Sequence, residues 1–394
     1  MRVVSKSPKT PSVGQYRFSN WPLALLALAG LFLTVRVAAA QLPNDQTVTL
    51  PLPAITPHWV YVVSPGYPSF LTNAYILDGD SMSVVGMVAG GLASNFEIAP
   101  DHHELYTIDT FYSRFSRGER TDVVSIFNGK TLEPAGEVAI PPKRMLVVLK
   151  RNATGISSDG RFLMITNFTP ATSISVVDLK ARRFVGEIDT PGCMEALVSG
   201  PRRFDSICSD GSLLTVDLDE SGKAANKRQG SPFFSVEKDP VFEHPAIMNG
   251  RAYFVSYHGQ VYPADLSGAT AKFDPAWPLA SVQEAAKGWR PGGWQLLAGH
   301  AREGLLYVLM HQGGEWTHKQ AGSEVWVFDV SSRRRLNRIV IPEAGDSIAV
   351  SQDQKPLLFV TTLKSGTMQV FSAQSGAYRG KINQLGVPFL LYNP

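Results

Sequence analysis

Cysteine is scarce in this chain of 394 residues, which contains only Cys193 and Cys208. The two are too widely spaced for a CxxC pair, which disfavours a redox or metal site built from them. The sequence also lacks a GxSxG elbow, a phosphate-binding loop and a dinucleotide fingerprint. No long helical pattern stands out. These absences remove common catalytic signatures and leave the arrangement of strands as the main source of information.

An excess of charge of one sign is also missing. Residues 1–40 hold five basic residues and no acidic residue. The remainder therefore has 37 − 5 = 32 basic against 34 acidic residues, a formal charge of −2. A near-neutral chain offers no basic stripe for nucleic acid. The one basic cluster, Arg333 to Arg335, falls in a predicted turn, where we interpret it as solvated.

No apolar run has the usual length of a membrane span. The longest near the N-terminus, residues 21–35, has 15 residues and is followed by Arg36. A bilayer needs about 20 apolar residues, so a membrane anchor is the weaker interpretation. Basic residues before the run and Val37-Ala-Ala-Ala40 after it are typical of a secretory signal peptide. We predict cleavage near Ala40, export to the periplasm by the general secretory route, and a mature chain of residues 41–394 without membrane attachment.

A single pair of cysteines in an exported chain favours a disulfide between Cys193 and Cys208. It would close a loop of about 16 residues and stabilise the fold by about 3 kcal/mol. We expect it to join two successive strands of the fourth repeat described next.

The sequence does contain a repeat. A strand that ends in a short polar residue and enters a tight turn recurs seven times, and these closing residues are 50, 50, 39, 48, 64 and 43 positions apart. Periods of this size indicate one four-stranded blade per repeat. Seven blades predict an all-β, seven-bladed β-propeller over residues 41–394. The closing residues are Asp78, Asn128, Asp178, Asp217, Asp265, Asp329 and Ser372.

The remaining strands of each blade follow from the same pattern. Residues 280–287, within the longest spacing, are expected to form one or two helical turns. Strand-like segments near both ends, residues 46–50 and 387–392, are expected to complete the ring. Closure of the ring leaves no exposed sheet edge, which would otherwise invite aggregation.

Candidate catalytic residues are few. His102 and His103 lie in a predicted turn, and the spacing of His311 and His318 does not match a metal-binding HExxH helix. His300, His311 and His318, together with Lys319, could equally anchor a long loop by hydrogen bonds. The closing aspartates recur in most blades, so we interpret them as acceptors for backbone N–H groups in the turns rather than as catalytic carboxylates.

Three irregular segments are rich in aromatic residues, at positions 64–70, 110–120 and 289–294. We interpret the second as a long loop within the second blade. Exposed aromatic and arginine side chains on one face of a disc suit a protein interface. The alternative is that these side chains cover the mouth of the channel.

Several segments, taken together and in order, carry a family resemblance. They include residues 117–124, Pro141-Pro-Lys-Arg144, residues 170–179, Phe254-Val-Ser-Tyr257 and residues 300–329. The chain resembles the large (heavy or alpha) subunit of periplasmic quinoprotein amine dehydrogenases over roughly residues 55 to 390. It is most similar to the aromatic amine dehydrogenase branch, with the methylamine dehydrogenase heavy chain a more distant relation.

The resemblance implies a seven-bladed propeller that assembles as α2β2 with a small, disulfide-rich subunit. That subunit carries tryptophan tryptophylquinone, made from two of its own tryptophans. The complex oxidises a primary, aromatic amine to aldehyde and ammonia and passes electrons to a blue copper protein such as azurin or amicyanin. No catalytic residue, cofactor or metal is then expected on this chain. With two cysteines, it cannot itself be the small subunit.

The resemblance also implies that one phenylalanine of the first blade lines the substrate entrance. Tyr67 aligns with it, but the local segment is one residue shorter, so Phe70 is the alternative. A tyrosine there would add a hydroxyl group to an apolar entrance. The competing interpretation is a loop aromatic packed on its own blade.

Two other functions stay open on the sequence alone. One is a free-standing exported propeller used for binding or scaffolding. The other is a metal-dependent propeller hydrolase, disfavoured by the lack of an irregular set of Asp, Glu and Asn residues on the innermost strands.

Overall fold

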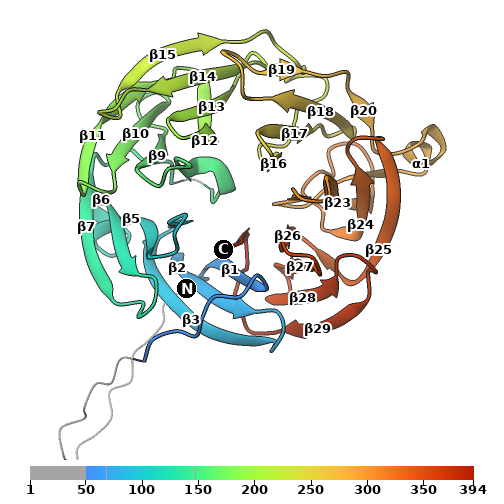
Figure 1. The fold of residues 1–394 in the computed structure, drawn as a ribbon, viewed down its shortest axis with the longest axis horizontal. Coiled ribbons are helices and arrows are strands. Elements are labelled where there is room, and N and C mark those ends of the chain that lie inside the picture. The colour runs from blue at the N-terminus through green and yellow to red at the C-terminus, as the bar shows by residue number, and fades with distance from the viewer. Residues whose placement is uncertain (1–49, 68, 147) are drawn as a thin grey trace, which may run out of the picture. The chain divides into compact units, whose positions relative to one another are not determined.

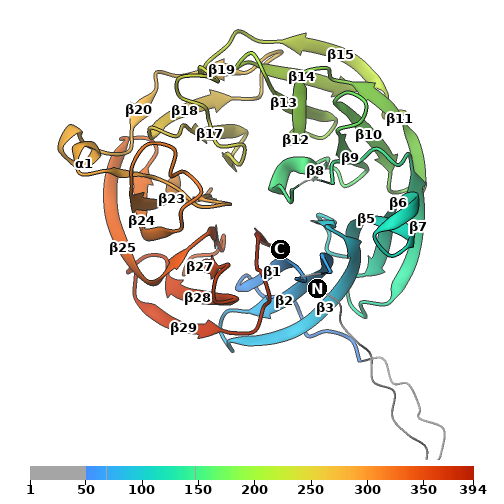
Figure 2. The same cartoon turned by 180° about the vertical axis from the view of Figure 1, so that it is seen from behind.

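Short strands alternate with tight turns along the chain. The computed structural model describes residues 50–67, 69–146 and 148–394. Their strands are rich in β-branched and aromatic residues, which pack well on a pleated surface. Within these residues, neighbouring strands pair antiparallel into seven sheets that stand around a central channel as blades (Figure 1). The ring is equally plain from behind (Figure 2). The predicted seven-bladed β-propeller is confirmed.

Each blade has four main strands, which follow one another from the channel outward. Blades 1 to 3 consist of β30 (Leu390–Tyr392), β1 (Trp59–Pro65), β2 (Leu71–Asp78) and β3 (Ser83–Leu92); β4 (Asn95–Ile98), β5 (Glu104–Arg114), β6 (Arg117–Asn128) and β7 (Pro134–Ile140); and β8 (Thr154–Ile156), β9 (Phe162–Asn167), β10 (Ser173–Asp178) and β11 (Arg183–Asp189).

Blades 4 to 7 continue in the same order. They consist of β12 (Cys193–Gly200), β13 (Arg203–Cys208), β14 (Leu213–Leu218) and β15 (Ala224–Gln229); β16 (Ala246–Met248), β17 (Arg251–Val255), β18 (Gln260–Asp265) and β19 (Lys272–Phe273); β22 (Leu297–His300), β23 (Leu305–Gln312), β24 (Gly322–Asp329) and β25 (Arg334–Gly345); and β26 (Ser347–Val350), β27 (Leu357–Thr362), β28 (Thr367–Ser372) and β29 (Tyr378–Ile382).

A few short elements lie outside this plan. β20 (Trp277–Pro278) pairs with β18, and β21 (Trp289–Pro291) pairs with β23. The 3-10 helix η1 (Arg151–Ala153) precedes β8. The α-helix α1 (Val282–Ala286) forms where helical turns were predicted, because Ser281 and Glu284 make a reciprocal capping box. Among the described residues, no helix has the length and apolar character to cross a bilayer.

The two ends of the described chain meet in blade 1. β30 pairs with β1, with Tyr61 opposite Tyr392 and Val62 opposite Leu391. The C-terminal strand therefore completes the ring, as predicted for residues 387–392. On the N-terminal side, Leu50 lies outside any strand, and residues 46–49 fall outside the described residues, as does the predicted signal segment 1–40.

The core lies between neighbouring sheets. Tyr106 and Val124 of blade 2, for example, share one apolar cluster with Ile156 and Leu163 of blade 3. Complete burial of such a side chain contributes about 1.5–3 kcal/mol. Because neighbouring blades cover both faces of a sheet, inner strands such as β9 and β10 are buried along their whole length.

Most closing aspartates act as predicted. Asp78, Asp178, Asp265 and Asp329 each accept a backbone N–H of the following turn at 2.7–2.9 Å. Asp217 differs, because it pairs with Arg203 and Arg228 at 2.6 Å each. The charges of those two arginines fix its carboxylate between β13, β14 and β15.

The basic cluster at positions 333–335 is less solvated than predicted. Arg335 forms an ion pair with Glu284 of α1 at 2.7 Å, and its guanidinium lies 4.2 Å from the ring centre of Trp326. Glu284 is 51 residues away in sequence, so the turn pattern gave no sign of this partner. The interpretation as a free surface cluster was wrong for Arg335.

Candidate docking face and central channel

Antiparallel pairing assigns every connection to one of two faces. In each blade the turn between the second and third strands lies on the same side as the connection to the next blade. We call this side the connection face. Turns between the first and second strands, and between the third and fourth, lie on the opposite face.

Exposed aromatic side chains gather on the connection face. Seven aromatic residues among the described ones are prominently exposed, and six belong to this face. Only Tyr378, near the turn between β28 and β29, belongs to the opposite face. Clusters of exposed aromatic side chains mark protein interfaces. The six are Tyr67, Phe70, Phe111, Phe115, Phe168 and Trp316.

Both predicted entrance residues lie at the tip of the β1–β2 hairpin. Tyr67 is 82% exposed and Phe70 is 52% exposed. Their rings meet edge to face, with centroids 6.3 Å apart. Phe70 has a positive φ of 58°, and its carbonyl accepts the backbone N–H of Ala93 at 2.8 Å. The hairpin therefore presents both rings to solvent, instead of folding one of them onto its own blade.

The predicted loop at residues 110–120 is a hairpin. β5 and β6 continue into it, with Tyr112 opposite Arg120 and Arg114 opposite Arg117. The two strands pair this far because Thr110 donates to Asp122 at 2.7 Å across them. Asp122 also accepts from Arg120 and from the backbone of Arg144. The interpretation of this irregular, aromatic-rich segment as a loop is therefore wrong, because polar groups of the two strands hydrogen-bond to one another across the hairpin.

The hairpin carries Phe111 and Phe115 on the connection face. A Cβ placed on Gly91 of β3 would lie 3.0 Å from the ring of Phe111, so the hairpin packs closely on blade 1. Phe115 is at the turn and is 63% exposed. These two rings extend the aromatic surface of the β1–β2 hairpin towards blade 2.

The histidines of blade 6 anchor a long connection between β23 and β24. His311 Nε2 lies 2.8 Å from Thr317 Oγ1, and burial lowers the pKa of His311 to about 4. His318 stacks on Tyr257 with centroids 4.0 Å apart. The predicted role in loop anchoring is confirmed for His311, and the same connection exposes Trp316.

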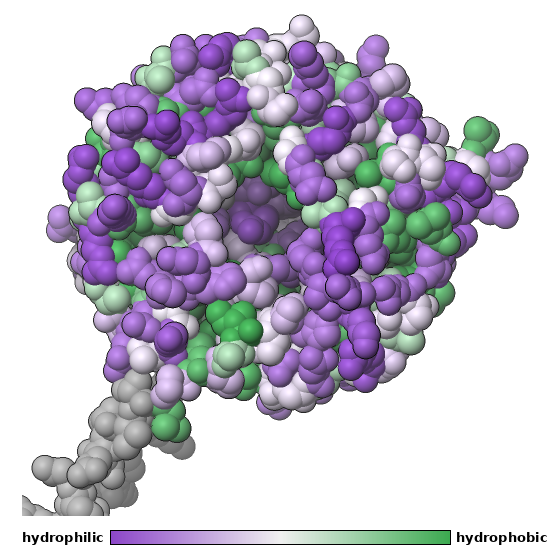
Figure 3. Space-filling view, in the orientation of Figure 1, coloured by the Kyte–Doolittle hydropathy of each residue, from purple (hydrophilic) through white to green (hydrophobic). Residues whose placement is uncertain are grey.

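Charged side chains from several blades meet in the channel. Lys150, before η1, forms an ion pair with Glu243, which lies between blades 4 and 5. Burial lowers the pKa of Lys150, whereas Glu195 on β12 opposes that shift and Lys319 of blade 6 adds to it. The disc is hollowed at its centre, and the hollow has a hydrophilic floor (Figure 3).

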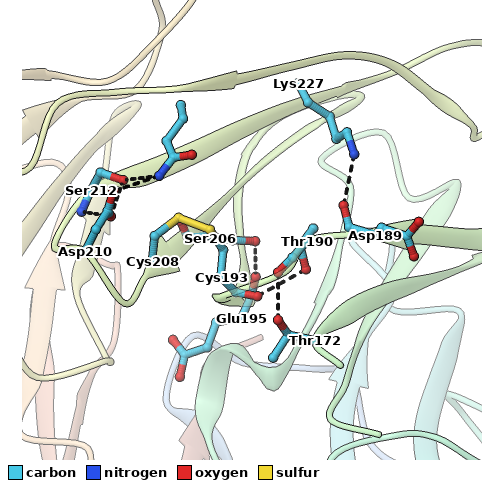
Figure 4. The surroundings of a disulfide bond; sticks show 11 residues. Thr172, Asp189, Thr190, Cys193, Glu195, Ser206, Cys208, Asp210, Ser212 and Lys227 are labelled. Carbon is cyan, nitrogen blue, oxygen red and sulfur yellow. Dashed lines mark hydrogen bonds between the residues drawn. A yellow bond between two sulfur atoms is a disulfide. The ribbon is translucent and has the colours of Figure 1, made fainter. Parts of the chain in front are cut away.

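Glu195 is the most unusual member of this group. It sits at an irregularity in the β12–β13 register, has a positive φ of 72° and is fully buried. Neither carboxylate oxygen has a hydrogen-bond partner among the described residues. Burial raises its pKa to about 8, and the Lys150 charge counteracts part of that shift. Figure 4 shows its side chain directed away from the nearby disulfide.

The disulfide itself is confirmed. Cys193 and Cys208 are joined at an S–S distance of 2.03 Å and lie opposite each other on β12 and β13 (Figure 4). It therefore connects the first two strands of blade 4, next to the residues that place Glu195.

Sequence reasoning missed the buried channel charges. Glu97 on β4 and Glu195 on β12 both lie on innermost strands, where no such set was expected. Both occur in short apolar segments, and an acidic residue inside an apolar run is the signal that could have found them. In the described part of the chain, no three His, Cys, Asp or Glu residues are grouped so that they could hold a metal.

The fold and this face define a class: a seven-bladed propeller with an aromatic connection face and a charged channel. Residues 57–391 match the methylamine dehydrogenase heavy chain (MADH) family, and the chain belongs to that family. It is 32% identical over 375 residues to the methylamine dehydrogenase heavy chain of Methylophilus methylotrophus, covering 92% of both chains. It is also 32% identical to that of Methylorubrum extorquens over 359 residues, 90% of this chain and 87% of the relative.

Solved structures of low sequence identity share the fold alone. A functionally unknown protein from Desulfotomaculum acetoxidans has a TM-score of 0.60 at 12% identity, covering 85% of this chain and 98% of its own. The dihydro-heme d1 dehydrogenase NirN has a TM-score of 0.55 at 14% identity, covering 89% and 78%.

Proposed function

We propose that this chain is the large, non-catalytic subunit of a periplasmic amine dehydrogenase. Its partner would be a small subunit that carries tryptophan tryptophylquinone, in an α2β2 assembly. The observation that carries the proposal is the aromatic connection face on a chain of the methylamine dehydrogenase heavy chain family. Exposed aromatic rings are the residues that anchor stable interfaces when a partner covers them.

The quinone would supply the oxidation of a primary amine to aldehyde and ammonia. This chain's cysteines are both consumed by one disulfide, which fits a scaffold better than the disulfide-rich subunit. Its own part is to hold the small subunit on the connection face and to shape the route to the reacting centre. Electrons would leave to a blue copper protein of the azurin or amicyanin type.

The β1–β2 hairpin would form part of the substrate entrance. Tyr67 and Phe70 offer two rings that meet edge to face at an interplanar angle of 76°, a shape that suits passage and retention of an aromatic amine. The hydroxyl of Tyr67 adds a hydrogen-bonding group at the rim of this surface. We therefore propose an aromatic primary amine as substrate.

Co-expression with the small subunit tests the assembly. The chain should co-purify with a cysteine-rich partner that shows quinone absorbance, and the complex should reduce a dye when an amine is added. Purification of this chain alone, with both genes expressed, would favour the free-standing exported propeller instead.

A variant at Tyr67 tests the entrance. In the complex, Tyr67→Ala should lower kcat/KM for benzylamine about twofold to tenfold, the worth of one aromatic contact of about 0.5–1.5 kcal/mol. Methylamine has no aromatic ring and makes no such contact, so its kcat/KM should stay nearly constant. Tyr67→Phe is the matched control for the hydroxyl group. Equal losses for both amines would contradict a role in selecting aromatic substrates.

A further inference from the structure

The central channel contains a cavity of about 410 Å³ that none of the proposed roles uses. Its wall is formed by the innermost strands of blades 5, 6, 7 and 1, together with Arg151, Asn152 and His244. The strands contribute mainly apolar residues, and the polar side chains come largely from the segments beside them. These polar groups decide what the cavity can hold.

The charge of the wall has one sign. Among the described residues that line the cavity, none is acidic, whereas Arg151 is cationic. Positive charge also surrounds His244. Burial lowers its pKa, and the charges of Lys150, Lys319 and Arg151 lower it further. The acidic groups nearest to these cations, Glu97, Glu195 and Glu243, do not line the cavity.

Arg151 is held by two neighbours, and its side chain is 32% exposed, so it keeps donors for a further acceptor. Its guanidinium carbon lies 3.7 Å from the ring centre of Tyr392, which fixes the plane of the group. Its Nη1 forms an ion pair with Glu97 at 3.5 Å, a distance at the long limit of a hydrogen bond. A guanidinium has five N–H donors, so most remain for another acceptor.

Three buried atoms of the residues in the wall have no hydrogen-bond partner among the described residues, and the hydroxyl oxygen of Tyr392 is one of them. Another is Nδ1 of His244, whose residue is only 3% exposed. The third is Oδ1 of Asn393, whose amide nitrogen is already committed to the carbonyl of Val350 at 2.7 Å. Buried polar atoms are rarely left unpaired, because their desolvation costs about 1–3 kcal/mol each.

We propose that this cavity binds a small oxyanion, a carboxylate or a phosphate, with Arg151 as its charged anchor and His244 beside it. Arginine suits such a ligand because its planar fork matches two oxygens at once. If the ligand is hydrogen phosphate, its one O–H group would donate to Oδ1 of Asn393. The site is separate from the aromatic entrance hairpin and does not depend on the amine dehydrogenase assignment.

Calorimetric titration of the full purified chain tests this site. Inorganic phosphate and acetate are the two probes, with sodium chloride at matched ionic strength as the reference. We expect saturable binding of at least one probe with a dissociation constant of about 1 mM or tighter. Binding of phosphate alone would assign an inorganic ligand, and binding of acetate would assign a carboxylate. No saturable heat with either probe would overturn the proposal.

The variant Arg151→Gln should weaken that binding about tenfold or more, since it removes a charge-assisted contact. The control Arg202→Gln removes an exposed arginine of blade 4 that pairs loosely with Glu220 at 3.7 Å, and it should leave binding unchanged. Equal binding by Arg151→Gln and the unmodified chain would contradict the assignment.

A measurement on the unmodified chain covers the case in which Arg151→Gln fails to fold. Phosphate or acetate should protect Arg151 from modification by phenylglyoxal, as mapped by mass spectrometry, while Arg202 reacts at the same rate. Unprotected Arg151 at a saturating concentration of both probes would reject the site.

Discussion

Whether a single acidic residue stabilises this propeller depends on the groups that surround its carboxylate. Asp78, Asp265 and Asp329 are partly exposed, and turn N–H groups satisfy each carboxylate. Glu195 sits in the channel wall with no hydrogen-bond partner for either oxygen among the described residues. The same chemical group is thus stabilising in one place and costly in the other, because burial without partners penalises the charged form.

The variant Glu195→Gln tests that cost through its pH dependence. Burial raises the folded-state pKa of Glu195 to about 8, so the folded chain holds a proton that the unfolded chain releases near pH 4.5. The stability that this bound proton contributes is therefore fully present below pH 4.5 and is lost as the pH rises through 8. We expect Glu195→Gln to match the unmodified chain at pH 5 and to exceed it at pH 9 by on the order of 1–3 kcal/mol.

Chemical denaturation at several pH values measures this difference. Glu220→Gln, a change at a carboxylate that is 90% exposed, is the control and should show no such trend. A variant that is less stable than the unmodified chain at pH 9 would mean that the Lys150 charge outweighs the burial of Glu195.

At the scale of elements, the periodicity of the chain predicted most strands correctly. Strand ends, turn residues and even α1 follow from local patterns, because each blade repeats one plan. The β5–β6 hairpin was missed because its polar residues pair with each other across strands, which no single strand reveals. Arg335 was missed for a similar reason, since its partner Glu284 is brought near by the fold alone.

The ion pair between Glu284 of α1 and Arg335 of β25 should make the free energy of unfolding depend on pH. The hydrogen bond from Arg335 lowers the pKa of Glu284 to about 2. A depressed folded-state pKa adds stability that is complete above pH 4.5 and is lost as pH falls towards 2. Glu284→Gln should thus cost about 1 kcal/mol at pH 7, in line with a partly exposed charged pair. The cost should shrink steadily between pH 4.5 and 3.

Urea unfolding across that pH range gives the comparison. Ser281→Ala removes the hydroxyl that accepts the backbone N–H of Glu284 and leaves the pair of Glu284 with Arg335 in place, so it measures the serine half of the cap alone. A loss that is constant from pH 7 to pH 3 would contradict a stabilising role for the ionised carboxylate of Glu284.

At the scale of the whole molecule, the two faces of the propeller differ in kind. The connection face displays six exposed aromatic side chains, whereas in the described chain the opposite face displays Tyr378 alone. The sequence predicts the ring, the aromatic segments and a face of the disc that displays them, but not which of the exposed rings lie on that face. Which segments share a face depends on the antiparallel order within each sheet, and the entrance role of Tyr67 and Phe70 stays a prediction.

The difference between faces predicts the effect of one charge on assembly. Phe115, at the tip of the β5–β6 hairpin, is 63% exposed and touches no core, so Phe115→Asp should leave the isolated chain as stable as before. Placed in a covered interface, the new carboxylate would lose hydration without a partner and weaken docking of the small subunit by about 1–3 kcal/mol. That corresponds to about a fivefold to hundredfold higher dissociation constant, measurable by analytical ultracentrifugation of the complex.

Leu336→Asp is the matched control, because Leu336 is 60% exposed on the outer strand β25, away from the connection face. Equal weakening by both variants would point to general charge effects, and no weakening by Phe115→Asp would move the small subunit off this hairpin.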